Sequence, residues 1–130
     1  MNLKIEPLLT LFARILLSLI FILSGFGKIG DWSGTTKYMA SKGMVAIPFF
    51  LAMAILCELG GGLSVLFGYK ARFGALVLIC FLVPVSLIFH NFWSFSGMEQ
   101  RMQMIHFLKN LAIMGGLLLV ARRGTGMPST

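Results

Sequence analysis

Ionisable side chains that could do chemistry lie inside or at the ends of long apolar stretches of this 130-residue chain. They are Arg14, Glu58, His90, His106 and Lys109. A charge at the centre of a bilayer costs at least ~2.5–3.5 kcal/mol on insertion scales, so such side chains persist where they face one another, a cavity or a ligand. We therefore expect a polar seam inside the protein, and we expect its function to lie in that seam.

The carboxylate of Glu58 needs a cationic partner. Counting from the ends of the apolar stretches puts Glu58 near mid-bilayer, and Arg14 and Lys109 each ~10 Å deep from opposite sides. We therefore predict that Glu58 pairs with Arg14 or Lys109. A triad of all three would leave one positive charge for a substrate oxygen or anion, whereas a simple buried pair would only fix the helix register. Gly61 and Gly62 follow Glu58 at helical spacing and form a small-residue groove that another helix can approach.

Two histidines are expected to meet on facing helices. His106 shares one helical face with Lys109 and Asn110, and His90 lies at the same shallow depth near the end of the preceding stretch. We predict that both rings occupy one pocket bordered by Trp93. The pair has three interpretations, namely hydrogen-bonded helix anchors, proton acceptors for a bound quinol, or axial ligands of haem or a metal. Haem fits least well because His90 has little apolar cover, so we predict neither haem nor metal.

The elements that must position these side chains are four apolar stretches, at about 8–27, 48–68, 73–93 and 102–120. Each is long enough, at ~1.5 Å per residue, to cross ~30 Å of hydrocarbon. Hydrophobic residues make up 58% of the chain and charged residues 12%, which is too apolar for the surface of a small soluble domain. The sequence predicts an all-α integral membrane four-helix bundle, with residues 1–130 as a single transmembrane domain.

The connector between the first two spans carries the signals of a short interfacial helix. Asp31 or Ser33 can cap a helix over 34–42, and Gly43 can end it. Further along, the tight turn at 69–72 makes the second and third spans antiparallel neighbours. Pro84 predicts a kink in the third span.

The first span also presents a polar face. Arg14, Ser18, Phe21, Gly25 and Lys28 recur at helical spacing, so Arg14 and Lys28 point to the same inward side.

The two cysteines, Cys57 and Cys80, lie inside apolar spans and far from any metal-ligand spacing. We expect buried free thiols. A disulfide between the second and third spans is the alternative.

The net charge of +7 comes from 11 Lys and Arg against 4 Asp and Glu. These basic residues are spread over helix ends and short loops, which is typical of contacts with anionic lipid headgroups. The sequence has no basic run with interleaved aromatic residues, which is the pattern that would suggest nucleic-acid binding. We expect a multi-pass protein of the inner (cytoplasmic) membrane, with both termini in the cytoplasm. Its partners would be the lipid bilayer and either further copies of itself or a larger membrane protein complex.

Several short motifs resemble the DoxX family of small four-span membrane proteins, in the same order along the chain. They are SGFGK at 24–28, YM at 38–39, KG at 42–43, ELGGG at 58–62, HNFW at 90–93, FLKN at 107–110 and GG at 115–116. The resemblance covers nearly the whole chain and implies the four-span architecture. The members that gave the family its name belong to a thiosulfate:quinone oxidoreductase associated with a terminal quinol oxidase. Asn91 stands where many members have Asp, so the resemblance implies no carboxylate proton acceptor beside His90.

We therefore expect a small membrane subunit of a quinone-linked redox complex, with ubiquinone or menaquinone in the polar seam. His90 and His106 would exchange protons as catalytic residues, and the quinone-binding residues would be Arg14, Lys28, Glu58, Trp93, Lys109 and Asn110. No residue pattern supplies an intrinsic redox centre, so electrons would come from a partner. The alternative is a non-enzymatic scaffold that packs its glycine faces against partner transmembrane helices. A proton or small-solute transporter fits less well because no inverted repeat is visible.

Overall fold

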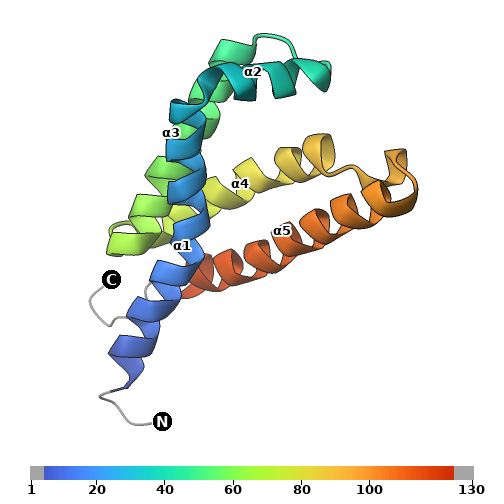
Figure 1. Cartoon of the computed structure of the whole chain (residues 1–130). Helices are drawn as coiled ribbons and strands as arrows, with labels where there is room; N and C mark the ends of the chain where they lie inside the picture. Colours follow the sequence, from blue (N-terminus) through green and yellow to red (C-terminus); the bar gives the residue numbers. More distant parts are fainter. Residues whose placement is uncertain (1–4, 125–130) are drawn as a thin grey trace.

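The computed structural model describes residues 5–124, and every regular element in that range is a helix (Figure 1). In chain order the elements are α1 (Glu6–Gly30), α2 (Trp32–Ser41), α3 (Ile47–Phe67), α4 (Ala71–Phe89), the 3₁₀ helix η1 (Phe92–Ser94) and α5 (Gly97–Arg123). Within the described range, α1, α3, α4 and α5 are long and apolar enough to cross a membrane. The prediction of four spans with a short helix between the first and second is confirmed.

The helices extend further than the apolar stretches that predicted them. α1 continues to Gly30 and α5 begins at Gly97, because backbone hydrogen bonding does not stop where the hydrocarbon does. The carboxylate of Asp31 accepts a hydrogen bond from the Gly34 backbone N at 3.2 Å, so Asp31 is the cap of α2. The turn into α4 uses two left-handed residues, Gly68 (φ 73°) and Lys70 (φ 51°), and it makes α3 and α4 antiparallel as expected.

Spans that are neighbours along the chain also pack together, α1 on α3, α3 on α4 and α4 on α5. Glycines set the closest approaches. A Cβ added at Gly61 would lie 2.6 Å from Leu78 Cγ of α4, and one at Gly25 would lie 2.7 Å from Leu59 Cγ of α3. No larger residue fits at these two crossings without moving a neighbour, so the small-residue groove predicted beside Glu58 is present.

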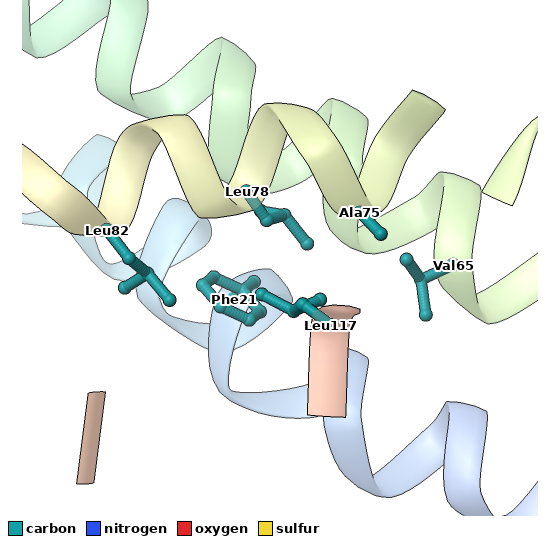
Figure 2. Packing of buried hydrophobic residues seen from close by; sticks show 6 residues of the cluster. All are labelled: Phe21, Val65, Ala75, Leu78, Leu82 and Leu117. Carbon is teal, nitrogen blue, oxygen red and sulfur yellow. The ribbon is translucent and has the colours of Figure 1, made fainter. Parts of the chain in front are cut away.

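All four spans converge on one buried cluster. Figure 2 shows its side chains pointing toward one another from α1 (Phe21), α3 (Val65), α4 (Ala75, Leu78, Leu82) and α5 (Leu117). Near this cluster α5 also reaches α1, because Leu17 packs over Gly116. We refer to this region as the closed end.

Away from the closed end, the α1–α3 pair and the α4–α5 pair diverge toward α2 and η1 (Figure 1). We call this region the open end. Helix α2 reaches across it, because the ring of Tyr38 stacks on Phe89 of α4 with 5.3 Å between centroids. Just after α2, Lys42 Nζ lies 5.0 Å from the ring centroid of Phe95. The open end is thus partly covered by α2 and the residues that follow it.

Both cysteines are free thiols, as expected. The expectation that both are buried is wrong for Cys80, which is exposed on α4, whereas Cys57 is half-buried. A span surrounded by lipid can expose a thiol at little cost, since a free cysteine behaves as a small apolar side chain.

Helix α4 continues through Pro84 to Phe89.

Candidate functional site

Among residues 5–124 a single ion pair is formed, between Lys28 Nζ of α1 and Glu58 Oε1 of α3, at 2.5 Å. Glu58 is 3% exposed, and Lys28 Nζ also donates a hydrogen bond to Ser24 Oγ at 2.7 Å. The buried carboxylate is therefore neutralised by a lysine near the end of the neighbouring span. That lysine is itself oriented by a hydroxyl one helical turn earlier.

The prediction that Glu58 pairs with Arg14 or Lys109 is wrong, because the register of α1 against α3 differs from the one that depth counting assumed. Gly25 lies against Glu58, while Gly62 lies against Phe21 one turn further along. Arg14 is eleven residues before Gly25, which is ~16 Å along the helix axis. Lys109 is exposed on α5, and α5 packs on α4 rather than on α3.

A cavity of about 390 Å³ opens beside this ion pair, between the end of α1, α2, the first half of α3 and the second half of α4. We call it the polar cavity. Lys28 lines it, so the ammonium group that neutralises Glu58 also reaches the cavity wall. The polar part of the wall is formed by Lys28, Asp31, Thr35, Tyr38 and His90, and the apolar part by Leu51, Ala54, Phe81, Val85 and Phe89.

Helix α2 and its N-terminal cap supply three of the polar wall residues. Asp31, Thr35 and Tyr38 are spaced at i, i+4 and i+7, so they share one helical face, and that face is turned to the cavity. The aromatic and capping residues of this segment indicate only an interfacial helix. Its polar stripe was the signal that could have identified it as a wall of the site.

An apolar groove of about 430 Å³ adjoins the polar cavity, because five residues line both spaces. The shared residues are Met39, Ala54, Phe81, Val85 and Phe89. The groove runs between α3 and α4 beneath the segment that follows α2, and three methionines, Met39, Met44 and Met53, contribute to it. Val45 and Phe50 at its edge are exposed, so the groove opens toward lipid. Together the two spaces form one site with a polar head and an apolar extension.

The two histidine rings lie together as predicted, with 5.0 Å between centroids and 31° between planes. His90 Nδ1 lies 2.8 Å from Gln103 Oε1 of α5. Since a carbonyl oxygen only accepts, this contact is a hydrogen bond in the tautomer that carries its proton on Nδ1, and that tautomer leaves Nε2 as an acceptor. His90 lines the polar cavity, whereas His106 is exposed on α5. The hydrogen bond to Gln103 also makes His90 an anchor between α4 and α5.

Three other predicted site residues, Trp93, Lys109 and Asn110, lie on the α4–α5 side of the protein and do not line the polar cavity. Asn110 Nδ2 donates to Ser86 Oγ of α4 at 3.0 Å and so joins the two helices. Trp93 packs edge-on against Phe92 and Phe107, with centroids 5.3 and 6.0 Å away. Lys109 is exposed.

The structure therefore places Lys28 and His90 on the wall of the polar cavity, with Glu58 paired to Lys28 and the His106 ring beside His90. Trp93, Lys109 and Asn110 do not line this cavity. Arg14 lies away from the cavity, in a groove between α1 and α5. In the range 5–124 no three His, Cys, Asp or Glu side chains gather in a way that could hold a metal ion. What the site can do chemically is offer hydrogen bonds and one cationic group to the polar end of a ligand, and an apolar channel to its tail.

Comparisons with known proteins agree with this architecture. The DoxX family model matches residues 9–91 of the chain. The inner membrane protein YqjF of Escherichia coli is 40% identical over 123 residues, which cover 95% of this chain and 89% of YqjF. The inner membrane protein YphA of the same organism is 35% identical, over 93% of this chain and 86% of YphA.

A more distant relative is the ER-derived vesicles protein ERV29 of Saccharomyces cerevisiae, which is 28% identical over 96% of this chain. The match covers only 33% of ERV29. No solved structure matches the chain.

Proposed function

We propose that this chain, which belongs to the DoxX family and is a multi-span protein of the inner membrane, binds an isoprenoid quinone in its polar cavity. It would do so as the membrane subunit of a quinone-linked redox complex. The observation that carries this proposal is that the polar cavity and the apolar groove adjoin each other and share five lining residues. A quinone has the same division, since a ring with two carbonyl oxygens is joined to a long hydrocarbon tail.

The polar cavity offers suitable partners for the ring. Carbonyl oxygens need donors, and the wall supplies the Lys28 ammonium and the Tyr38 hydroxyl. Its volume of about 390 Å³ falls in the range of roughly 300–1,000 Å³ that is usual for small-molecule sites. The Glu58 carboxylate holds Lys28 in place, so one charged donor is already oriented before a ligand arrives.

The apolar groove offers room for an isoprenoid tail. Methionine side chains are flexible and polarisable, which suits them to a long and irregular hydrocarbon. The exposed edge at Val45 and Phe50 would let the tail pass into the bilayer.

His90 supports a role in proton exchange. Its Nδ1 is engaged by Gln103, and its Nε2 can accept a proton from a hydroxyl of a bound quinol. His106 lies 5.0 Å away by ring centroids and is exposed, so it can pass that proton outward. The quinone supplies reversible two-electron and two-proton chemistry, and the electrons would be exchanged with a redox centre in a partner subunit.

A scaffold function is the second candidate, and the exposure of α5 favours it. Leu117 is the one buried residue of this helix within the described range, while Leu108, Leu111 and Leu118 are exposed. An apolar face of this kind can pack against lipid or against the transmembrane helices of a partner. Under this proposal the polar side chains around the cavity would only stabilise the open end.

Lipid extracts of the purified protein test the quinone proposal. We expect a molar ratio of quinone to protein above the ratio set by the surrounding membrane lipid. Ala54→Leu should reduce the quinone content to that bulk ratio, because Ala54 lines both the polar cavity and the apolar groove and a larger side chain would block their junction.

The matched control is Ala52→Leu, which makes the same change on an exposed face of α3. Lys109→Met should also leave the quinone content unchanged, since Lys109 is exposed on α5. Quinone at bulk ratio in the parent protein, or equal content in the Ala54 and Ala52 variants, would favour the scaffold function.

A further inference from the structure

A second groove lies at the closed end, on the side of the molecule where α1 begins and α5 ends. It has a volume of about 700 Å³ and runs between these two helices. Small residues, Ala13, Ala112 and Gly116, leave the space between the helices open, and Leu16 and Leu119 form apolar walls. Neither the quinone site nor the ion pair uses this groove.

Arg14 gives the groove an unsatisfied cationic donor. Its Nε is buried and has no hydrogen-bond partner among residues 5–124. The one ion pair in that range joins Lys28 to Glu58, so no described carboxylate neutralises Arg14. A buried guanidinium donor without an acceptor is costly, and an anionic oxygen bound in the groove would satisfy it.

A second arginine lies on the same groove at the membrane boundary. Arg123 is the last residue of α5, and its side chain lines the groove together with Arg14 and Thr10. Guanidinium groups bind phosphate oxygens through paired hydrogen bonds, so two of them are complementary to one phosphodiester. Toward the bilayer centre, the groove reaches the contact between Leu17 and Gly116, and its walls there are apolar.

We infer that this groove binds an anionic phospholipid, with the phosphodiester held between Arg14 and Arg123 and one acyl chain along the α1–α5 seam. The charge of the groove selects an anion, and its apolar extension selects a lipid over a free phosphate ion. Basic pockets between transmembrane helices at the headgroup level have the properties that anionic lipids need. The bound lipid would join α1 to α5 beyond the contacts that Leu17 makes with Gly116 and that Phe21 and Leu117 make in the shared cluster.

Native mass spectrometry of the purified chain tests this inference. The protein in a neutral detergent is titrated with dioleoylphosphatidylglycerol and, separately, with dioleoylphosphatidylcholine, which has the same acyl chains but no net charge. We expect tighter binding of phosphatidylglycerol. Arg123→Gln should weaken it about tenfold, as the loss of a charge-assisted hydrogen bond implies. Arg14→Gln should weaken it at least as much.

Arg122→Gln is the matched control. Arg122 neighbours Arg123 at the end of α5 but does not line the groove, so the affinity should change less than about twofold. Because Arg123 is exposed, its variant tests the inference even if the Arg14 variant does not fold. The quinone content of Arg123→Gln should equal that of the parent, which separates this site from the proposed function.

Three results would overturn the inference. One is equal affinity for the two phospholipids. Another is phosphatidylglycerol binding that is the same in the Arg123 and Arg122 variants. The third is displacement of the lipid by inorganic phosphate at a comparable concentration, which would assign the two arginines to a free anion.

Discussion

The closed and open ends of this protein are built from the same four spans, yet their interiors differ. At the closed end the spans pack on one apolar cluster, and at the open end they leave a polar cavity between them. At the closed end the contacts are made by glycine and by aliphatic side chains, as at Gly61 against Leu78. At the open end α4 carries Phe81, Val85 and Phe89, which line the cavity. The close packing at the closed end therefore depends on a glycine that admits a neighbouring side chain.

Charge is distributed unequally between the two ends as well. The buried ion pair of Lys28 and Glu58 lies at the open end, where α2 can bring further polar groups to it. At the closed end Arg14 and Arg123 line the groove between α1 and α5 and are not part of the shared apolar cluster. A buried charge is tolerated in a span when it is paired and close to a polar space, and the open end meets both conditions.

The largest effect on this contrast should come from breaking the ion pair. Lys28→Met would leave the Glu58 carboxylate buried without its partner, and we expect a loss of about 3 kcal/mol in stability, or a failure to accumulate in the membrane. The double variant Lys28→Met with Glu58→Gln removes both charges and should recover most of that loss. Thermal unfolding of the purified variants measures both. A Lys28→Met variant as stable as the parent would show that the ion pair contributes little to the stability of the open end.

A smaller but still large effect is expected from forcing the closed end apart. Gly61→Leu places a side chain where Leu78 Cγ and the Gly74 carbonyl already lie within 2.6 and 3.1 Å of an added Cβ. We expect about 1–3 kcal/mol of destabilisation, as is usual for overpacking. Gly60→Leu is the matched control, because nothing lies within 4 Å of a Cβ at that position. Equal unfolding temperatures for the two variants would contradict the account of the closed end.

The smallest effect is expected at the link between α4 and α5. Asn110→Ala removes the hydrogen bond to Ser86 Oγ, and interhelical hydrogen bonds in membranes contribute about 1 kcal/mol. Ser86→Ala should cost a similar amount, and the double variant should cost little more than either change alone. A double-mutant cycle by thermal unfolding measures this coupling. Additive losses would mean that the two side chains do not stabilise each other.

The sequence predicted the fold because the signals for it are local. The length of each span is read from one run of consecutive apolar residues. The signals for the helix ends lie within a few residues of those ends, as with Pro7 in α1, the Asp31 cap of α2 and the left-handed Gly68 after α3. The meeting of His90 and His106 was predictable for a related reason. The short segment that joins α4 to α5 restricts how these helices can be aligned, and so the two rings fall at the same level.

The partner of Glu58 could not be predicted in the same way. It depends on the register between α1 and α3, which are separated by α2 and its flanking loops and which meet through Gly25 and Gly62. Counting residues from the ends of the spans cannot supply that register, because helices begin at different levels relative to the membrane. The contribution of α2 to the cavity was missed for the same reason, since it depends on how a connector folds over the spans.

The central claim is that the polar cavity and the apolar groove together bind a quinone, and photolabelling tests it most directly. Membranes containing the protein would be irradiated with a ubiquinone analogue that carries an azide on the ring, and the labelled peptides would be identified by mass spectrometry. The account predicts labels on residues of the polar cavity, in α2 and in the second half of α4, and their loss in excess unmodified quinone. Labels concentrated on the exposed face of α5 around Lys109, or scattered over all lipid-facing residues, would contradict it.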